Sequence, residues 1–186
     1  GGGFLAPALL STGENHFVSL CLYCTLLTSA AVLAALRRKW RVVNLLAFAG
    51  TWVLFSGWFE KYYRESMQGA ASAPPQLAAV LGWLAFFFVL FNAIPLLYEL
   101  LRRQKVRAED VVLVSLNGLV VFYYAVTVLN PWREALAAAC VVMGLGYCGL
   151  LFAVARRSPD DKPTRLTLTL LAVFELTIAV PFYFQL

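Results

Sequence analysis

The chain has 186 residues, of which 61% are hydrophobic and only 13% are charged. A soluble domain carries about 45–50% apolar and about 25% charged residues, and a core of this size cannot bury so much apolar surface. The composition therefore excludes an ordinary soluble fold and indicates lipid as the main solvent. The net charge of +5 does not predict nucleic-acid binding, because the basic residues form short clusters between apolar runs and no groove with interleaved aromatics.

Six apolar segments are long enough to cross a bilayer. They cover residues 17–36, 42–59, 77–101, 111–129, 135–155 and 166–184. Each is near the ~20 residues that a helix needs to span a ~30 Å hydrocarbon core. The segments do not alternate with period two, and a helix satisfies its backbone groups within the segment. The sequence predicts an all-α polytopic membrane protein, with one domain of six transmembrane helices (residues 1–186) arranged as three helical hairpins.

The basic residues predict the topology. Twelve of the fifteen lie in three alternate loops, at residues 37–41, 102–107 and 156–165. The loops at the opposite end of the predicted helices hold only Lys61, Arg64 and Arg133. Short cytoplasmic loops collect Lys and Arg, so both termini should face the outer, periplasmic side. Each basic loop contains an Arg-Arg pair, which is consistent with an internal hairpin repeat and also with the ordinary placement of loop arginines. Residues 61–67 lie in the outer loop between the second and third segments, and a short interfacial helix is possible there.

Polar residues within the apolar segments are the intramembrane candidates. Glu175 lies near the middle of the sixth segment, where an ionised side chain costs about 2.5–3.5 kcal/mol on insertion scales. We expect its carboxyl to face the bundle interior, either as a proton or ion site or as a hydrogen-bonded group that holds helices together. Asn92 and Pro95 are expected to break the third helix, and Asn117 lies in the fourth. Such residues mark either a substrate site or interhelical hydrogen bonds.

Small residues in the fifth segment predict close helix packing. Gly144, Gly146 and Gly149 would give a face without side chains, against which another helix can lie. Pro181, near the end of the sixth segment, should bend or weaken the last turns.

The remaining reactive residues do not form a recognisable site. His16 is the only histidine, and with Glu14 it forms an outer-interface candidate that lacks a nucleophile. The four cysteines lie in apolar runs, where core packing is the default, and the pair Cys21 and Cys24 does not complete a four-ligand zinc site. No nucleotide-binding, zinc or hydrolase motif occurs. The sequence therefore predicts no catalytic residue, metal site or cofactor.

Two stretches resemble a known family. The segment Tyr23–Tyr63, with Leu-Arg-Arg-Lys-Trp-Arg-Val-Val-Asn-Leu-Leu, is similar to a recurring hairpin of a large bacterial multi-pass membrane family catalogued as domain of unknown function 2339. The segment Ala172–Pro181 is similar to another hairpin end of that family, although Glu175 stands where an apolar residue is expected. Because members have many more than six helices, the resemblance implies a fragment, a split subunit or part of a longer chain, which agrees with the absence of a basic region before Leu10. It implies no particular activity.

Three function classes stay open. The leading one is a structural or interaction module of the bacterial inner membrane, either a scaffold or an accessory subunit. Its expected partners are membrane lipids and other membrane subunits or the rest of a longer chain. The second is a transporter or channel for a lipid, a small solute or protons, centred on Glu175. The third is a cell-envelope enzyme, for which only His16, Glu14, Glu60 and Glu65 are available at one interface.

Overall fold

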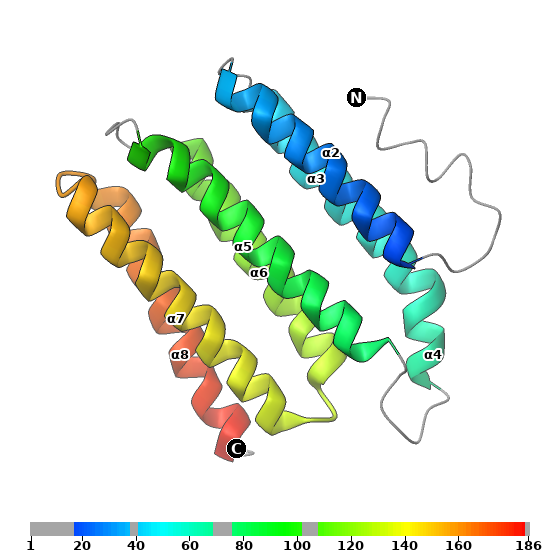
Figure 1. Cartoon of the computed structure of the whole chain (residues 1–186). Coiled ribbons are helices and arrows are strands. Elements are labelled where there is room, and N and C mark those ends of the chain that lie inside the picture. Colours follow the sequence, from blue (N-terminus) through cyan, green and yellow to red (C-terminus); the bar gives the residue numbers. More distant parts are fainter. Residues whose placement is uncertain (1–16, 38–40, 69–75, 102–107, 185–186) are drawn as a thin grey trace. The chain divides into compact units, whose positions relative to one another are not determined.

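The computed structural model describes residues 17–37, 41–68, 76–101 and 108–184 (Figure 1). Within these ranges the chain consists of helices and short connections and contains no strand. The all-α class predicted from the continuous apolar segments is therefore confirmed. The chain divides into two compact units, the first ending at Leu77 and the second beginning at Ala78.

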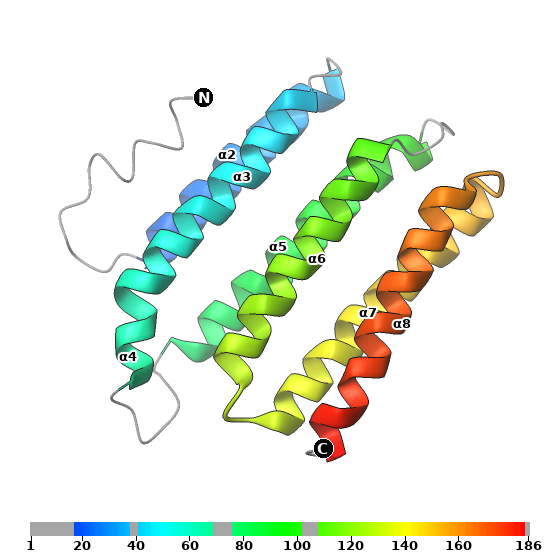
Figure 2. The same cartoon turned by 180° about the vertical axis from the view of Figure 1, so that it is seen from behind.

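The first unit is built on α2 (Phe17–Arg37) and α3 (Arg41–Trp58), which lie side by side (Figures 1 and 2). Because only three residues separate them, they run antiparallel, as short connections require. The Thr28 and Thr51 hydroxyls form a 3.1 Å hydrogen bond in the buried contact between them. A polar pair of this kind joins helices inside an apolar surrounding, because each hydroxyl satisfies the other.

The helix α3 continues into a π-helical turn, η2 (Phe59–Tyr63), and then into α4 (Arg64–Gln68). The short helix considered for residues 61–67 is thus part of a longer helical run. Phe17 stacks on Trp58 with ring centroids 4.0 Å apart, and both rings are buried, as is Tyr63. These rings therefore form an aromatic core for this unit.

The second unit contains four helices: α5 (Leu77–Leu101), α6 (Ala108–Leu129), α7 (Arg133–Arg157) and α8 (Lys162–Phe184). The helices α7 and α8 form the most closely packed pair, and α6 contacts both. Both cartoon views place α5 beside α6 (Figures 1 and 2). All four helices therefore contribute to one interior.

Two tight connections fix the direction of α7 and α8. At the first, the Trp132 N–H donates to the Leu129 carbonyl over 2.8 Å. At the second, the Asp161 carboxylate accepts 2.8 Å and 3.4 Å hydrogen bonds from the Thr164 hydroxyl and N–H. Asp161 directly precedes α8 and thereby satisfies an N–H that the first helical turn leaves without a partner.

Each of the six apolar segments forms a helix, and each observed end lies within four residues of the predicted one. The predicted break at Asn92 and Pro95 is wrong, because α5 runs without interruption to Leu101. The Asn92 amide instead donates to the Phe88 carbonyl of its own helix over 2.8 Å, and membrane helices tolerate proline when the freed backbone groups find other partners. Pro181 lies inside α8, which continues to Phe184.

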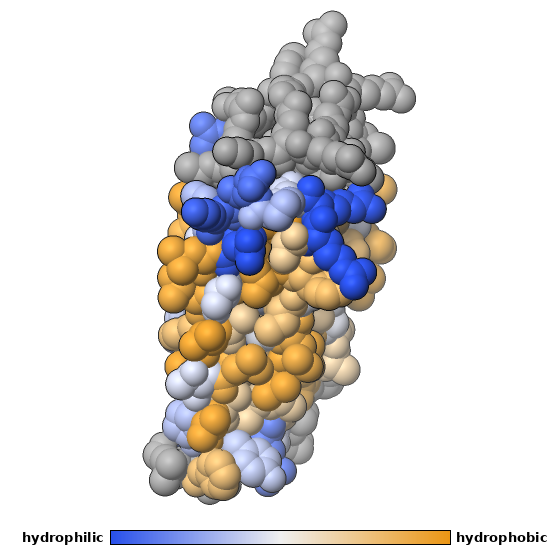
Figure 3. Space-filling model, turned by 90° about the vertical axis from the view of Figure 1, so that its left-hand side faces the viewer, coloured by the Kyte–Doolittle hydropathy of each residue, from blue (hydrophilic) through white to orange (hydrophobic). Residues whose placement is uncertain are grey.

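Three of the described helices are long and apolar enough to cross a membrane: Glu109–Leu129, Arg133–Arg157 and Lys162–Phe184. Two shorter apolar helical stretches are Phe17–Ala30 and Leu77–Ala93. Figure 3 shows a broad apolar band on the face formed by α7 and α8, with hydrophilic residues gathered at its upper end. Such a band fits the hydrocarbon core of a bilayer, with the polar end at headgroup depth.

Candidate functional site

Glu175 lies on the buried face of α8, with only 2% of the residue exposed. That face repeats every three or four residues, at Thr164, Leu168, Ala172, Glu175 and Ala179, which is the spacing of one side of a helix. The small residues Ala172 and Ala179 lie one turn away on either side, so the longer carboxyl side chain has room between them. The expectation that this carboxyl faces the interior is confirmed.

The neighbouring helix α7 approaches Glu175 closely because Gly144 has no side chain. A Cβ atom at Gly144 would lie only 2.7 Å from Cγ of Leu176 on α8. One turn earlier, the buried Cys140 thiol donates a hydrogen bond to the Glu175 carboxyl. The carboxyl oxygen Oε2 has no hydrogen-bond partner among the described residues. The contact between α7 and α8 therefore gives the Glu175 carboxyl one weak donor, the Cys140 thiol, and leaves its Oε2 atom without a donor among the described residues.

Asn92 on α5 and Asn117 on α6 meet at a shared backbone carbonyl. Their amide nitrogens both donate to the Phe88 oxygen, over 2.8 Å and 3.3 Å. Both side chains are buried, and within the described part of the chain neither Oδ1 atom has a hydrogen-bond partner. Each amide is thus oriented by its nitrogen and presents its oxygen to the interior of the unit.

Tyr147 on α7 connects these two sites. Its ring meets Phe88 edge-on, with centroids 5.2 Å apart, and its hydroxyl lies beside the Asn92 side chain and interacts electrostatically with Glu175. The hydroxyl is fully buried and makes no hydrogen bond of good geometry to a described residue. It fits there because Gly118 of α6 lacks a Cβ, which would overlap the Tyr147 oxygen.

These five residues form what we call the polar cluster: Asn92, Asn117, Cys140, Tyr147 and Glu175. All four helices of the second unit contribute to it, and it contains four buried oxygen atoms without a partner in the described ranges: Asn92 Oδ1, Asn117 Oδ1, Tyr147 Oη and Glu175 Oε2. The described residues that are buried include no Lys or Arg. The Glu175 carboxyl accepts from the Cys140 thiol, and in its protonated form a carboxyl can also donate to an oxygen acceptor.

The sequence identified three members of the cluster, Glu175, Asn92 and Asn117, from their polarity within apolar segments. It missed Cys140 and Tyr147 as partners, because both residue types are common in apolar cores. The signal that could have found them is their spacing: with Gly144 they lie at intervals of four and three on α7, one face of a helix. Only the packed bundle determines which face of α7 meets Glu175.

The other sequence candidates do not join this site. His16 and Glu14 lie outside the described residues. Cys21 and Cys24 are buried and unbridged on α2, and the described chain contains no group of three or more metal-ligating side chains. Glu60 and Glu65 are exposed, and Arg64 pairs with Glu60. No second reactive cluster therefore emerges from the described ranges.

The predicted glycine face of α7 is partly correct. A Cβ atom at Gly146 would lie 3.1 Å from the Phe88 ring on α5, in addition to the Gly144 contact with α8. A Cβ atom at Gly149, by contrast, would meet nothing within 4 Å. The prediction for Gly149 is wrong because this residue is exposed and faces away from both helices.

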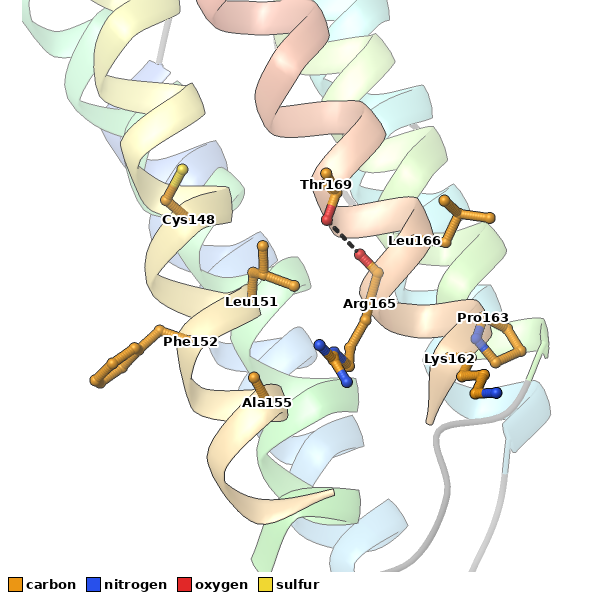
Figure 4. Close-up of a pocket in the computed structure, with 9 residues that line it drawn as sticks. All are labelled: Cys148, Leu151, Phe152, Ala155, Lys162, Pro163, Arg165, Leu166 and Thr169. Carbon is orange, nitrogen blue, oxygen red and sulfur yellow. Dashed lines mark hydrogen bonds between the residues drawn. The ribbon is translucent and has the colours of Figure 1, made fainter. Parts of the chain in front are cut away.

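A pocket of about 990 Å³ lies between the second half of α7 and the first turns of α8 (Figure 4). Its walls come from residues 148–155 and 162–169 and are mostly apolar. Lys162 and Arg165 are its two basic lining residues, and the Thr169 hydroxyl is bonded to the Arg165 carbonyl over 2.8 Å. The pocket is separate from the polar cluster in its lining residues, although both lie along the same pair of helices.

Comparison with known proteins supplies the family. Searches of the curated proteins and of the solved structures each found no match to the chain. The family described as "Predicted membrane protein (DUF2339)" matches residues 1–186. The match agrees with the resemblance seen in the hairpin sequences and with the apolar helices of the second unit. The chain therefore belongs to the DUF2339 family of predicted membrane proteins.

Proposed function

We propose that this chain is a structural or interaction module of the membrane, acting as a scaffold or an accessory subunit of a larger assembly. The observation that carries the proposal is the outward surface of α8. Leu166, Leu170, Val173 and Val180 are 50–63% exposed, so one side of this helix offers a continuous apolar surface. Lipid can cover such a surface, and so can the helix of another membrane subunit.

The polar cluster supports a structural role. Hydrogen bonds between polar side chains stabilise membrane helix contacts by about 0.6 kcal/mol on average, with larger values in model peptides. The Phe88 carbonyl accepts from both α5 and α6, and the Cys140 thiol bonds Glu175 across α7 and α8. These bonds set which faces of the helices meet, and they leave the apolar faces outside.

We further propose six crossings of the bacterial inner membrane as three hairpins, with both termini periplasmic. The helices α2, α3 and α5 contain 21, 18 and 25 residues, which correspond to about 27–38 Å at the helical rise. The twelve-to-three division of basic residues favours this orientation.

Cysteine labelling tests the orientation. A membrane-impermeant maleimide should label Glu65→Cys in intact cells, and should label Asp160→Cys only after permeabilisation. Both positions are exposed. Labelling of the native chain measures the background signal from its own cysteines. The reverse pattern would overturn the proposed topology.

The module proposal predicts a defined assembly. In mild detergent, light scattering should give a protein mass above the 20.6 kDa of one chain, from a second copy or from a stoichiometric partner. Replacing Leu170 and Val173 by alanine should reduce that mass, whereas alanine at Val112 and Leu119, exposed residues of α6, should leave it unchanged. A single chain without a partner, or equal behaviour of both variants, would contradict the interaction role.

A second candidate function, proton transport, is favoured by the buried oxygens around Glu175 that have no partner among the described residues. A carboxyl that has donors and acceptors on neighbouring helices can exchange a proton without a change of fold. If the chain conducts protons, vesicles containing it should acidify under an imposed potential, and Glu175→Gln should abolish this while retaining the helical spectrum and stability. A rate equal to that of empty vesicles would remove this candidate, and so would an unchanged rate in the glutamine variant.

A further inference from the structure

The pocket between α7 and α8 has one apolar part and one basic part. Leu151 of α7 points toward α8, and Phe152 of α7 and Leu166 of α8 lie at the edges of the apolar part (Figure 4). Lys162 and Arg165 lie toward the connection between the helices. An apolar hollow with cationic groups at one end matches an amphiphile that has a negatively charged head.

The basic side chains lie at that end, Arg165 between the two helices and Lys162 on the other side of the first turn of α8 (Figure 4). Arg165 donates one guanidinium N–H to the Pro159 carbonyl over 3.0 Å, which orients the group, and a guanidinium has four further N–H donors. The Arg156 guanidinium lies over the Phe152 ring, 4.1 Å from its centroid, and adds positive charge beside the pocket. Of the nearby carboxylates, Asp161 is buried and bonded to Thr164.

The position of the pocket identifies the source of the ligand. It lies on two helices that are long and apolar enough to span a membrane, next to the connection that joins them. Phe152 and Leu166 are exposed, so the apolar part opens toward lipid. Basic pockets between membrane helices on the cytoplasmic side suit anionic lipid headgroups.

We propose that this pocket binds one anionic phospholipid, with its phosphate held by Lys162 and Arg165 and an acyl chain lying against Leu151, Phe152 and Leu166. This inference depends on membrane insertion and is independent of the scaffold role. Each basic side chain near an anionic surface strengthens binding about five-fold. The pair should therefore give about a 30-fold preference for an anionic lipid over a zwitterionic lipid with the same acyl chains.

Native mass spectrometry of the detergent-purified chain tests this. Phosphatidylglycerol should bind as a single retained molecule and at about 30-fold lower concentration than phosphatidylcholine. The double variant Lys162→Gln with Arg165→Gln should lose this preference, whereas Lys61→Gln with Arg133→Gln, which removes the same charge elsewhere, should keep it. Both pocket cations are exposed, so their replacement should not disturb the fold, and Arg165→Glu gives an independent variant that should reduce phosphatidylglycerol binding further.

Three outcomes would overturn the proposal. The first is equal binding of the two lipids to the native chain. The second is a preference that survives in the double pocket variant. The third is displacement of the bound lipid by millimolar inorganic phosphate or by a second copy of the chain, which would identify a simple anion site or a protein contact instead. If the double pocket variant still forms the larger assembly, its loss of lipid preference concerns the lipid proposal alone and leaves the scaffold proposal standing.

Discussion

Replacing Gly118 by alanine tests the contact between α6 and α7 at the polar cluster. The added Cβ would overlap the Tyr147 hydroxyl oxygen and would lie 3.2 Å from Cζ of the same ring. Tyr147 is fully buried and packs edge-on against Phe88, so the ring cannot move away without disturbing α5. Overpacking of this kind costs about 1–3 kcal/mol, whereas the higher helix propensity of alanine returns about 0.5–1 kcal/mol.

A second substitution distinguishes the contribution of the Tyr147 hydroxyl oxygen to this clash from that of the ring. Tyr147→Phe removes a hydroxyl that makes no hydrogen bond of good geometry to a described residue, so the change should itself cost little. In that background the nearest atom to the new Cβ is the ring carbon at 3.2 Å, which needs a shift of only a few tenths of an ångström. The cost of Gly118→Ala should therefore fall by at least about 1 kcal/mol, a coupling typical of residues in contact.

Thermal unfolding of the detergent-solubilised chain, followed by tryptophan fluorescence, measures this. For a chain of this size about 1 kcal/mol corresponds to about 2–4 °C in Tm. Gly149→Ala serves as the matched control, because a Cβ atom at that position would have nothing within 4 Å, and it should leave Tm unchanged or raise it slightly. Equal destabilisation by Gly118→Ala in the native and Tyr147→Phe backgrounds would refute the proposed contact.

Two further substitutions test other parts of the second unit by the same assay. Gly144→Ala should destabilise by about 1–3 kcal/mol, because its Cβ would lie 2.7 Å from Cγ of Leu176, whereas Gly82→Ala, with open space around it, should not; equal Tm values would show that α7 and α8 are farther apart. Asp161→Ala should cost about 0.5–2 kcal/mol through loss of the N-cap of α8, whereas the exposed neighbour Asp160 should tolerate alanine without loss. A neutral Asp161→Ala would contradict the capping role.

Much of the secondary structure could be predicted from the sequence. Long apolar runs separated by basic clusters determine where helices begin and end, because a backbone in lipid must satisfy its own hydrogen bonds. The error at Asn92 arose because a polar residue before a proline usually marks a break, whereas here its amide bonds the carbonyl of Phe88 within the same helix. Local sequence does not indicate whether such an amide will leave the helix or bond back onto it.

The sequence by itself indicated that lipid surrounds much of the chain and where the helices begin and end. It also indicated which polar residues are costly to bury. It marked Glu175, Asn92 and Asn117 because a polar group among apolar ones is visible without a fold. Only the tertiary structure decided that these residues belong together, and that Cys140 and Tyr147 complete the cluster. The physical reason is that all faces of α7 are similarly apolar, so the hydrophobic pattern of α7 does not indicate which of its faces turns inward. Close contacts at Gly118 and Gly144, where a methyl group would collide with a neighbouring helix, set that choice.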